Sequence, residues 1–237
     1  MKIRIQSLLS LAAAVAFVGA TAGTAKANLL VNGNFESVTA PLNEVHLLTL
    51  APGDTALTGW SITGPTIDVV GKNYWLPAGG DYSVDLTGTQ GAGGIQQTIT
   101  TQVGKKYLVT LDMAPNPENY FNPLTSVDEI TIPRILEISA GADSATWERH
   151  ALTNSITSLA WETITWEFIA TDTETTIAFK SLGTALYTGM AIDNVSVDEV
   201  PGGIIDPRGG GGGIPEPASL GILGLGGLLM LRRRSRN

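Results

Sequence analysis

Asp193 is the side chain of this sequence that most plainly requires a chemical partner. Ala191, Asp193, Val195 and Val197 stand two residues apart, so in a β-strand they would all point to one apolar face. An unpaired carboxylate there would cost several kcal/mol or be forced neutral. Two solutions stay open: backbone N–H donors from a neighbouring turn, or a hard cation such as Ca²⁺. For a cation, the turn-rich residues 32–36 (Asn-Gly-Asn-Phe-Glu) could supply further oxygen ligands.

Tyr74 and Trp75 suggest a second kind of chemistry, because they lie in a polar segment, residues 71–77. An exposed indole ring can pack against the C–H face of a sugar, while neighbouring polar groups bind its hydroxyls. The alternative is that Trp75 closes the hydrophobic core, and the usual burial of indole rings favours this alternative.

Catalysis has little support in the sequence. The two histidines, His46 and His150, lie in polar or loop contexts, and we expect both to be ordinary surface residues. Neither a Gly-x-Ser-x-Gly elbow nor a His-Glu-x-x-His zinc site occurs. Carboxylates are numerous enough for a glycosidase pair, but their number alone identifies none. The absence of cysteine excludes disulfides, thiolate metal sites and cysteine nucleophiles.

The charge of the chain limits its partners. It contains 14 Lys and Arg against 22 Asp and Glu, and half of the basic residues stand before residue 28 or after residue 231. The chain between these ends is therefore strongly acidic. We expect it to repel nucleic acid and anionic lipid surfaces.

Residues 1–27 have the order of a secretory signal peptide. Lys2 and Arg4 provide the positive start, residues 8–20 are apolar, and Ala25-Lys26-Ala27 places small residues at the two positions that signal peptidase requires. The alternative, a buried N-terminal helix, does not account for this order. The pattern predicts cleavage before Asn28.

Residues 214–237 form a second segment of this kind. Pro215, Glu216 and Pro217 precede the uncharged residues 218–231, and an arginine cluster follows. As a helix, 218–231 would be about 21 Å long, short of the ~30 Å hydrocarbon core, so we expect a marginal transmembrane span. The arginines would stay cytoplasmic, and the protein would be held at the membrane only transiently.

This order of Pro-Glu-Pro, glycine-rich apolar span and arginine tail resembles the PEP-CTERM sorting signal. The resemblance implies a protein of exopolysaccharide-producing Gram-negative bacteria whose C-terminus is recognised and removed by an exosortase. The glycine-rich residues 206–213 would then be a flexible linker. The mature body would span residues 28–205.

The body alternates apolar and polar residues with the period of two that is typical of β-strands. The clearest runs are residues 82–87, 95–100, 107–113, 135–140, 163–170, 176–180 and 191–198. About eight to ten such strands predict one all-β domain, an antiparallel β-sandwich or jelly roll. The proline-bearing segments 39–58 and 114–133 fit poorly as strands, and we expect functional or mobile rim loops there.

The body resembles the choice-of-anchor C family of exported bacterial proteins, which are galactose-binding-like jelly rolls. The resemblance rests on residues 28–36 and 191–197 as its two ends, and on the segments that start at Gly59, Gly80, Gly94 and Gly104. That family is related to an uncharacterised domain of plant cell-wall proteins and, more distantly, to carbohydrate-binding modules. In related modules a structural calcium often lies between the first and last strands, which implies Glu36 and Asp193 as its ligands here.

We therefore expect an exported, non-enzymatic protein of the cell surface or extracellular matrix that binds polysaccharide. Tyr74 and Trp75 are its candidate ligand-binding residues, and structural calcium is its candidate cofactor. Signal peptidase and exosortase would be its partners during export. The alternatives are a structural or adhesive matrix protein without a small-molecule site and, with the least support, a secreted hydrolase.

Overall fold

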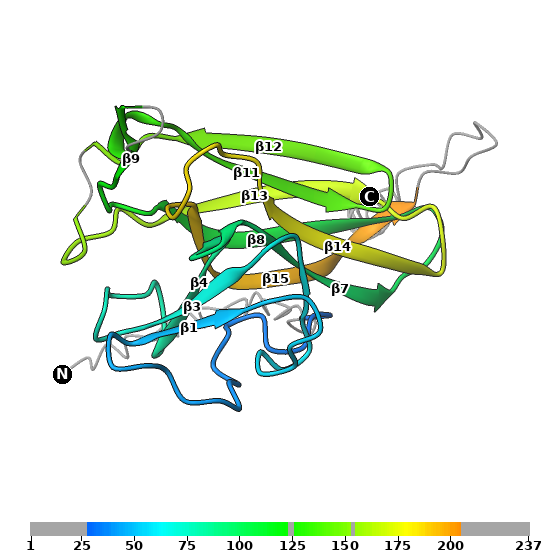
Figure 1. The fold of residues 1–237 in the computed structure, drawn as a ribbon. Helices are drawn as coiled ribbons and strands as arrows, with labels where there is room; N and C mark the ends of the chain where they lie inside the picture. The colour runs from blue at the N-terminus through cyan, green and yellow to red at the C-terminus, as the bar shows by residue number, and fades with distance from the viewer. Residues whose placement is uncertain (1–27, 123–125, 153–154, 205–237) are drawn as a thin grey trace, which may run out of the picture.

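The computed structural model describes residues 28–122, 126–152 and 155–204 (Figure 1). The signal peptide predicted over residues 1–27, the linker 206–213 and the sorting signal 214–237, with its span 218–231, lie outside these ranges. Within the described ranges, no helix combines the length and the apolar character needed to cross a membrane.

Two antiparallel sheets stack against each other, which confirms the predicted sandwich (Figure 1). The first sheet has six strands in the order β1 (Leu47–Leu50), β3 (Ile67–Gly71), β4 (Tyr82–Asp85), β15 (Met190–Ile204), β8 (Lys105–Pro115) and β13 (Glu162–Ile169). The second has five, in the order β12 (Asp143–Arg149), β11 (Arg134–Ala140), β14 (Glu174–Ser181), β7 (Gly94–Thr100) and β2 (Ser61–Thr63). Because the chain crosses repeatedly between the sheets, the topology is of the jelly-roll type.

Short elements lie at the rims. They are the pair β5 (Thr87–Gly88) and β6 (Gly91–Ala92), the pair β9 (Phe121–Asn122) and β10 (Val127–Asp128), and the 3₁₀ helix η1 (Glu129–Thr131). The prediction of loops over 39–58 and 114–133 is therefore wrong in part. β1 lies in the first of these segments, and the second holds the end of β8 together with β9, β10 and η1.

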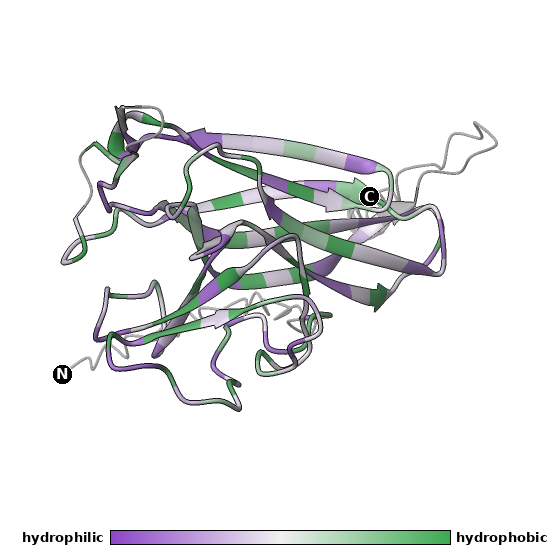
Figure 2. Cartoon of the chain, in the orientation of Figure 1, coloured by the Kyte–Doolittle hydropathy of each residue, from purple (hydrophilic) through white to green (hydrophobic). Residues whose placement is uncertain are grey.

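The core lies between the sheets because alternate residues of each strand point inward. Val109, Leu111 and Met113 of β8 face this core from one sheet, and Leu136 and Ile138 of β11 face it from the other. Figure 2 shows the resulting alternation of hydropathy along the strands.

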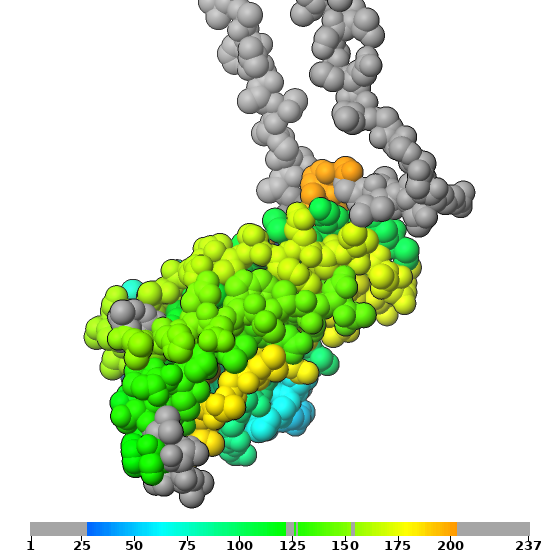
Figure 3. Space-filling view, turned by 90° about the horizontal axis from the view of Figure 1, so that it is seen from above, coloured from blue at the N-terminus to red at the C-terminus, as the bar shows by residue number. Residues whose placement is uncertain are grey.

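The outer face of the five-stranded sheet is polar. Thr98 and Thr176 share a hydrogen bond of 2.8 Å across neighbouring strands, and Glu137 stands opposite Lys180. Figure 3 looks down on the molecule from above, where β11 and β12 (green) lie beside residues near 180 (yellow). The exposed polar side chains on the outer face of the five-stranded sheet suit a solvated surface.

Residues 28–36 and the last strand, β15, contact each other, which is consistent with the family resemblance of the two ends of the body. Leu29 N donates to Val197 O at 3.0 Å, and Val195 N donates to Gly33 O at 2.8 Å. A Cβ atom at Gly33 would lie 2.0 Å from Val195 O, so only glycine permits this approach. The contact brings residues 28–36 against β15.

Candidate functional site

The outer face of the six-stranded sheet is covered at one end by the loop 72–81. Ile67, Val69 and Val84 point into the main core, so their neighbours Asp68 and Asp85 point outward, and the two carboxylates stand opposite each other in the β3–β4 register. Trp75 from the loop packs on this face, against Val70, Ala114 and Ala191.

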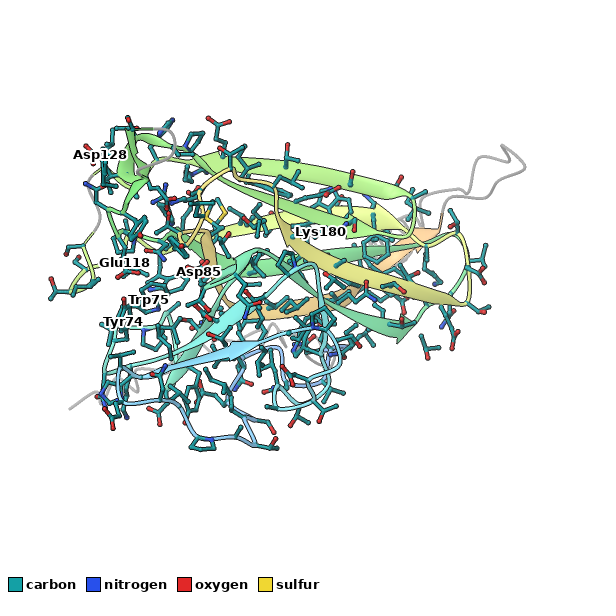
Figure 4. The ribbon with its side chains drawn as sticks, viewed as in Figure 1. Tyr74, Trp75, Asp85, Glu118, Asp128 and Lys180 are labelled. Atoms are coloured by element: carbon teal, nitrogen blue, oxygen red, sulfur yellow. The ribbon has the colours of Figure 1, made fainter. Side chains whose placement is uncertain are left out.

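A small pocket opens beside Trp75. Its volume is ≈ 20 Å³, which is room for about one water-sized group. Its lining residues come from three strands and three connecting segments: Leu47, Asp68, Val70, Tyr74, Trp75, Asp85, Asn116, Glu118 and Tyr187. We call it the acidic pocket. Figure 4 shows Tyr74, Trp75, Asp85 and Glu118 close together at the end of the sandwich near β9, with Lys180 well away from them.

Asp85 is fully enclosed in the wall of this pocket and is bound from several directions. Its carboxylate accepts hydrogen bonds from Thr87 N at 2.9 Å, from Gly189 N at 3.1 Å and from Asn116 Nδ2 at 2.6 Å. Burial still raises its pKa to about 7, because these donors only partly offset the loss of water. The carboxylate of Asp85 therefore ties β4 and β5 to two segments that follow other strands.

The other two carboxylates accept from hydroxyl groups. Asp68 accepts from Thr49 Oγ1 at 2.6 Å, and burial raises the pKa of Asp68 above its ordinary value. Glu118 accepts from the phenol of Tyr74. Burial, together with this bond, raises the pKa of Tyr74, so its phenol remains a hydrogen-bond donor at neutral pH.

Two exposed tyrosines stand at the edge of the acidic pocket. The rings of Tyr120 and Tyr187 meet edge to face with centroids 4.7 Å apart. They are 45% and 39% exposed, and Phe121 beside them is 56% exposed. This arrangement leaves aromatic surface open to a ligand directly beside the carboxylates.

Arg134 positions the segment that carries Glu118 and Tyr120. It begins β11 of the opposite sheet, is fully buried, and donates from Nη1 to the carbonyl oxygens of Glu129 (2.5 Å) and Ile132 (2.6 Å). Its Nη2 donates to the carbonyl oxygens of Asn116 and Glu118, both at 3.2 Å. Nη1 and Nη2 are thus bound by backbone carbonyl oxygens, while Nε is buried without a hydrogen-bond partner among the described residues.

Glu129 extends the same network to the segment that carries Tyr187. Its carboxylate accepts from Leu186 N at 2.7 Å and from Thr188 Oγ1 at 3.0 Å. The two segments that form the aromatic edge are therefore joined through buried polar contacts, which hold the edge in place before any ligand arrives.

The two predicted ligand-binding residues, Tyr74 and Trp75, have different surroundings. Tyr74 lines the acidic pocket. Trp75 is only 2% exposed and donates through Nε1 to Ser83 Oγ at 2.8 Å. Its ring faces are covered, so it cannot stack on a sugar, and the alternative that it closes the core fits its burial.

Sequence reasoning missed Asp68, Asp85, Glu118 and Tyr187. Asp85 was visible only as an outward residue of a predicted strand, where a carboxylate is ordinarily solvated. The available signal was an outward aspartate between hydroxyl residues (Ser83 and Thr87). Its burial depends on the loop 72–81 and on residues more than 100 positions away, which no local pattern reveals.

Asp193 lies at a second corner, and its expected orientation is wrong. A β-bulge separates Asp193 from Ser196, and Asn194 has a positive φ of 49°. Ile192, Val195 and Val197 face the main core, whereas Asp193 stands opposite the outward-facing Asp112. The bulge interrupts the alternation of inward and outward side chains along β15. Asp193 is nevertheless 0% exposed.

Backbone N–H groups donate hydrogen bonds to the carboxylate of Asp193, which is one of the two ways of stabilising it that the sequence left open. Gly79 N donates at 2.9 Å and Asn194 N at 2.7 Å. Burial, with smaller contributions from the nearby carboxylates of Glu36 and Asp112, still raises the pKa of Asp193 to about 7. Its donors are therefore insufficient to stabilise a full negative charge.

Glu36 faces the same turn from the other side. Its Oε1 accepts from Asp81 N at 2.9 Å and from Tyr82 N at 3.1 Å. Gly80 has a φ of +63°, which favours glycine, and a Cβ atom there would lie 2.2 Å from that oxygen. Glu36 and Asp193 thus bind the two ends of the turn 79–82. Across the described ranges, no three His, Asp or Glu side chains gather closely enough to hold a metal ion, so a cation here would need carbonyl and water ligands as well.

Both histidines are exposed, as expected. His150 Nε2 lies 3.8 Å from Glu148 Oε1. His46 immediately precedes β1 and is not among the residues that line the acidic pocket.

The fold and pocket define a β-sandwich domain of the jelly-roll class. The chain belongs to the family described as "protein of unknown function (DUF642)", which matches residues 28–198. It is 31% identical over 199 residues to halomucin of Haloquadratum walsbyi, a match that covers 82% of this chain and 2% of halomucin.

Two solved structures of low sequence identity match part of the chain. The arabinose-bound MgGH51 α-L-arabinofuranosidase is 15% identical, with a TM-score of 0.47, and the match covers 76% of this chain and 28% of the enzyme. TmCBM61 in complex with β-1,4-galactotriose is 13% identical, with a TM-score of 0.43, and the match covers 74% of this chain and all of that module. These values are too low to transfer a ligand or an activity.

Proposed function

We propose that this protein is a non-enzymatic polysaccharide-binding domain whose binding site is the acidic pocket with its aromatic edge. One sugar ring would lie against Tyr187 and Tyr120, and one of its hydroxyl groups would enter the pocket. The observation that carries this proposal is the exposed tyrosine pair immediately beside three buried or half-buried carboxylates.

The chemistry of the two parts is complementary in the way that sugars require. Sugar C–H groups pack on aromatic faces, and carboxylate oxygens accept hydrogen bonds from sugar hydroxyls. Because the pocket holds about one water-sized group, it suits a single substituent of the ring. The buried network around Arg134 and Glu129 holds this edge in shape, which lowers the ordering cost of binding.

A glycan array probed with the purified protein tests the proposal. We expect retention of at least one polysaccharide and about tenfold weaker binding after Tyr187→Ala combined with Tyr120→Ala, which corresponds to about 1.4 kcal/mol. Val103, 64% exposed between β7 and β8, offers the control variant Val103→Ala. Unchanged retention in the tyrosine variant, or no glycan retained at all, would contradict this function and favour a structural matrix protein.

The protein is, on this proposal, exported to the cell surface or extracellular matrix. The support is the sequence alone: the signal-peptide order of residues 1–27 and Pro215-Glu216-Pro217 before the apolar residues 218–231 and the arginines. Exosortase would remove the C-terminal segment. The mass of the C-terminal peptide from the native protein, measured in cell and medium fractions, tests this; an intact arginine tail in the mature protein counts against it.

Structural calcium at Glu36 and Asp193 is the third part of the proposal. The support is that Asp193 is fully buried, has only two backbone donors and lies near other carboxylates. Ca²⁺ would remove this electrostatic cost, with backbone carbonyls and water as its other ligands. In this position it would fasten the N-terminal segment and the turn 79–82 to β15.

A further inference from the structure

A second cavity lies beside the loop 72–81. Its volume is ≈ 210 Å³, and its lining residues are Leu42, His46, Gly71, Lys72, Asn73, Asp81 and Tyr82. The same loop contributes Tyr74 and Trp75 to the acidic pocket. The loop therefore places residues in both cavities. We call this one the loop cavity.

Backbone hydrogen bonds fix the walls of the loop cavity. His46 N donates to Asn43 O at 2.9 Å, and Gly71 N donates to His46 O at 3.0 Å, so the turn before β1 is attached to the end of β3. The two ends of the loop are joined where Lys72 N donates to Asp81 O at 2.8 Å. The cavity is thus formed by ordered backbone on both sides.

The side chains around the loop cavity differ in charge from those of the acidic pocket. Lys72 Nζ and Asp81 Oδ1 form an ion pair at 2.5 Å, so the single lysine and the single aspartate of the lining neutralise each other. His46 and Asn73 add donors and acceptors, while Leu42 and Tyr82 add apolar surface. A mixed lining without net charge suits a ring that carries hydroxyl groups on an otherwise apolar frame.

The size of the loop cavity limits what it can hold. Sites for drug-sized ligands span about 300–1,000 Å³, and 210 Å³ is smaller than these. An acidic sugar would also need an unpaired cation, and Lys72 is already bound to Asp81. The lining therefore fits one uncharged ring better than an oligosaccharide or a uronic acid.

We propose that the loop cavity is a second carbohydrate subsite, which takes one uncharged sugar ring. The inference deepens the proposed function, since a polysaccharide long enough to reach both cavities would bind in both of them. Occupation of the second subsite would then be intramolecular and would tighten binding without new contacts at the first.

An NMR titration of the full chain with single sugars tests the subsite directly. The probes are glucose, galactose, mannose, xylose and N-acetylglucosamine, with glucuronic acid as the charged comparison. We expect at least one neutral sugar to shift the side-chain signals of His46, Asn73 and Tyr82 saturably, and glucuronic acid to shift them less. The double variant His46→Ala, Asn73→Ala should weaken this binding about tenfold, as followed at Tyr82.

Two control variants separate this inference from the proposed function. His150→Ala removes the other exposed histidine and should leave the Tyr82 response unchanged. Tyr187→Ala should weaken binding at the acidic pocket and leave the loop cavity's response intact. If no neutral sugar moves the three signals, or if the double variant binds with unchanged affinity as followed at Tyr82, the second subsite is refuted, whatever happens at Tyr187.

Discussion

Asp85 and Asp193 are both buried on the outer side of the six-stranded sheet, and burial raises the pKa of each to about 7. Their surroundings differ. Asp85 accepts hydrogen bonds from three separate segments; the carboxylate of Asp68 raises its pKa, and Arg134 is close enough for an attractive interaction with it. Asp193 has two backbone donors, and the charges that act on it come from the carboxylates of Glu36 and Asp112.

Two carboxylates that are equally buried therefore need not have an equal need for a ligand. At Asp85 the protein supplies its own donors, so the carboxylate serves as a structural centre for the acidic pocket. At Asp193 the surroundings add negative charge and too few donors, which is the condition under which a cation stabilises a fold. Two experiments test this difference between Asp85 and Asp193.

The pH dependence of stability addresses Asp85. Its ordinary pKa is 3.8, and it is about 7 in the folded protein. Between pH 4 and pH 7 the unfolded chain has lost this proton while the folded protein keeps it, so the free energy of unfolding falls as pH rises through this window and levels off above it. A pKa difference of about three units sets an upper limit of about 4 kcal/mol on this change in the free energy of unfolding.

The measurement is a series of urea unfolding curves between pH 4 and pH 8, for the wild type and for Asp85→Asn. Asp68 and Asp193 also have raised pKa values, so the difference between the two proteins isolates Asp85. We expect the asparagine variant, which cannot titrate there, to show a smaller fall. Parallel curves would mean that Asp85 is ionised throughout and that its donors fully stabilise the charge.

Calcium addresses Asp193 and has a smaller expected effect. A bound ion at 100 times its dissociation constant stabilises the folded state by about 2.7 kcal/mol. We expect CaCl₂ to raise the Tm of the wild type over that in chelator, and Asp193→Asn or Glu36→Gln to lose this response. Asp85→Asn is the matched control, because that carboxylate is equally buried and should leave the response intact.

A Tm that does not move with calcium would remove the distinction drawn between the two carboxylates. If the rise in Tm with calcium is lost in Asp85→Asn as well as in Asp193→Asn, the ion, or its influence, lies at the acidic pocket. Either result would refute calcium at the corner of Glu36 and Asp193.

The strands with clear alternation were predictable, and those without it were not. β7, β8, β11, β13 and β14 correspond to predicted runs because one face of each meets the core. β3 is buried at all five positions, so it shows no alternation. β1 is a short strand inside a proline-bearing segment, and only its pairing with β3 makes it a strand.

Asp193 shows how a local rule can identify a residue and misplace it. The sequence singled it out as a carboxylate among apolar residues, and it is fully buried. The bulge after it changes the phase, so it points to the outer face beside Asp112 and not into the main core. Nothing in the alternation of residues 191–197 marks where the bulge occurs.

The period of two and the turn residues, which act over a few positions, were enough to predict the all-β class and most of the strands of the sandwich. The meeting of residues 28–36 with the last strand was implied only by the resemblance. It took the folded structure to establish that Trp75 is covered, that Asp68 and Asp85 share a pocket, and that the loop 72–81 contributes residues to two cavities. Burial and shared cavities depend on contacts between residues far apart in the chain, and local patterns carry no record of them.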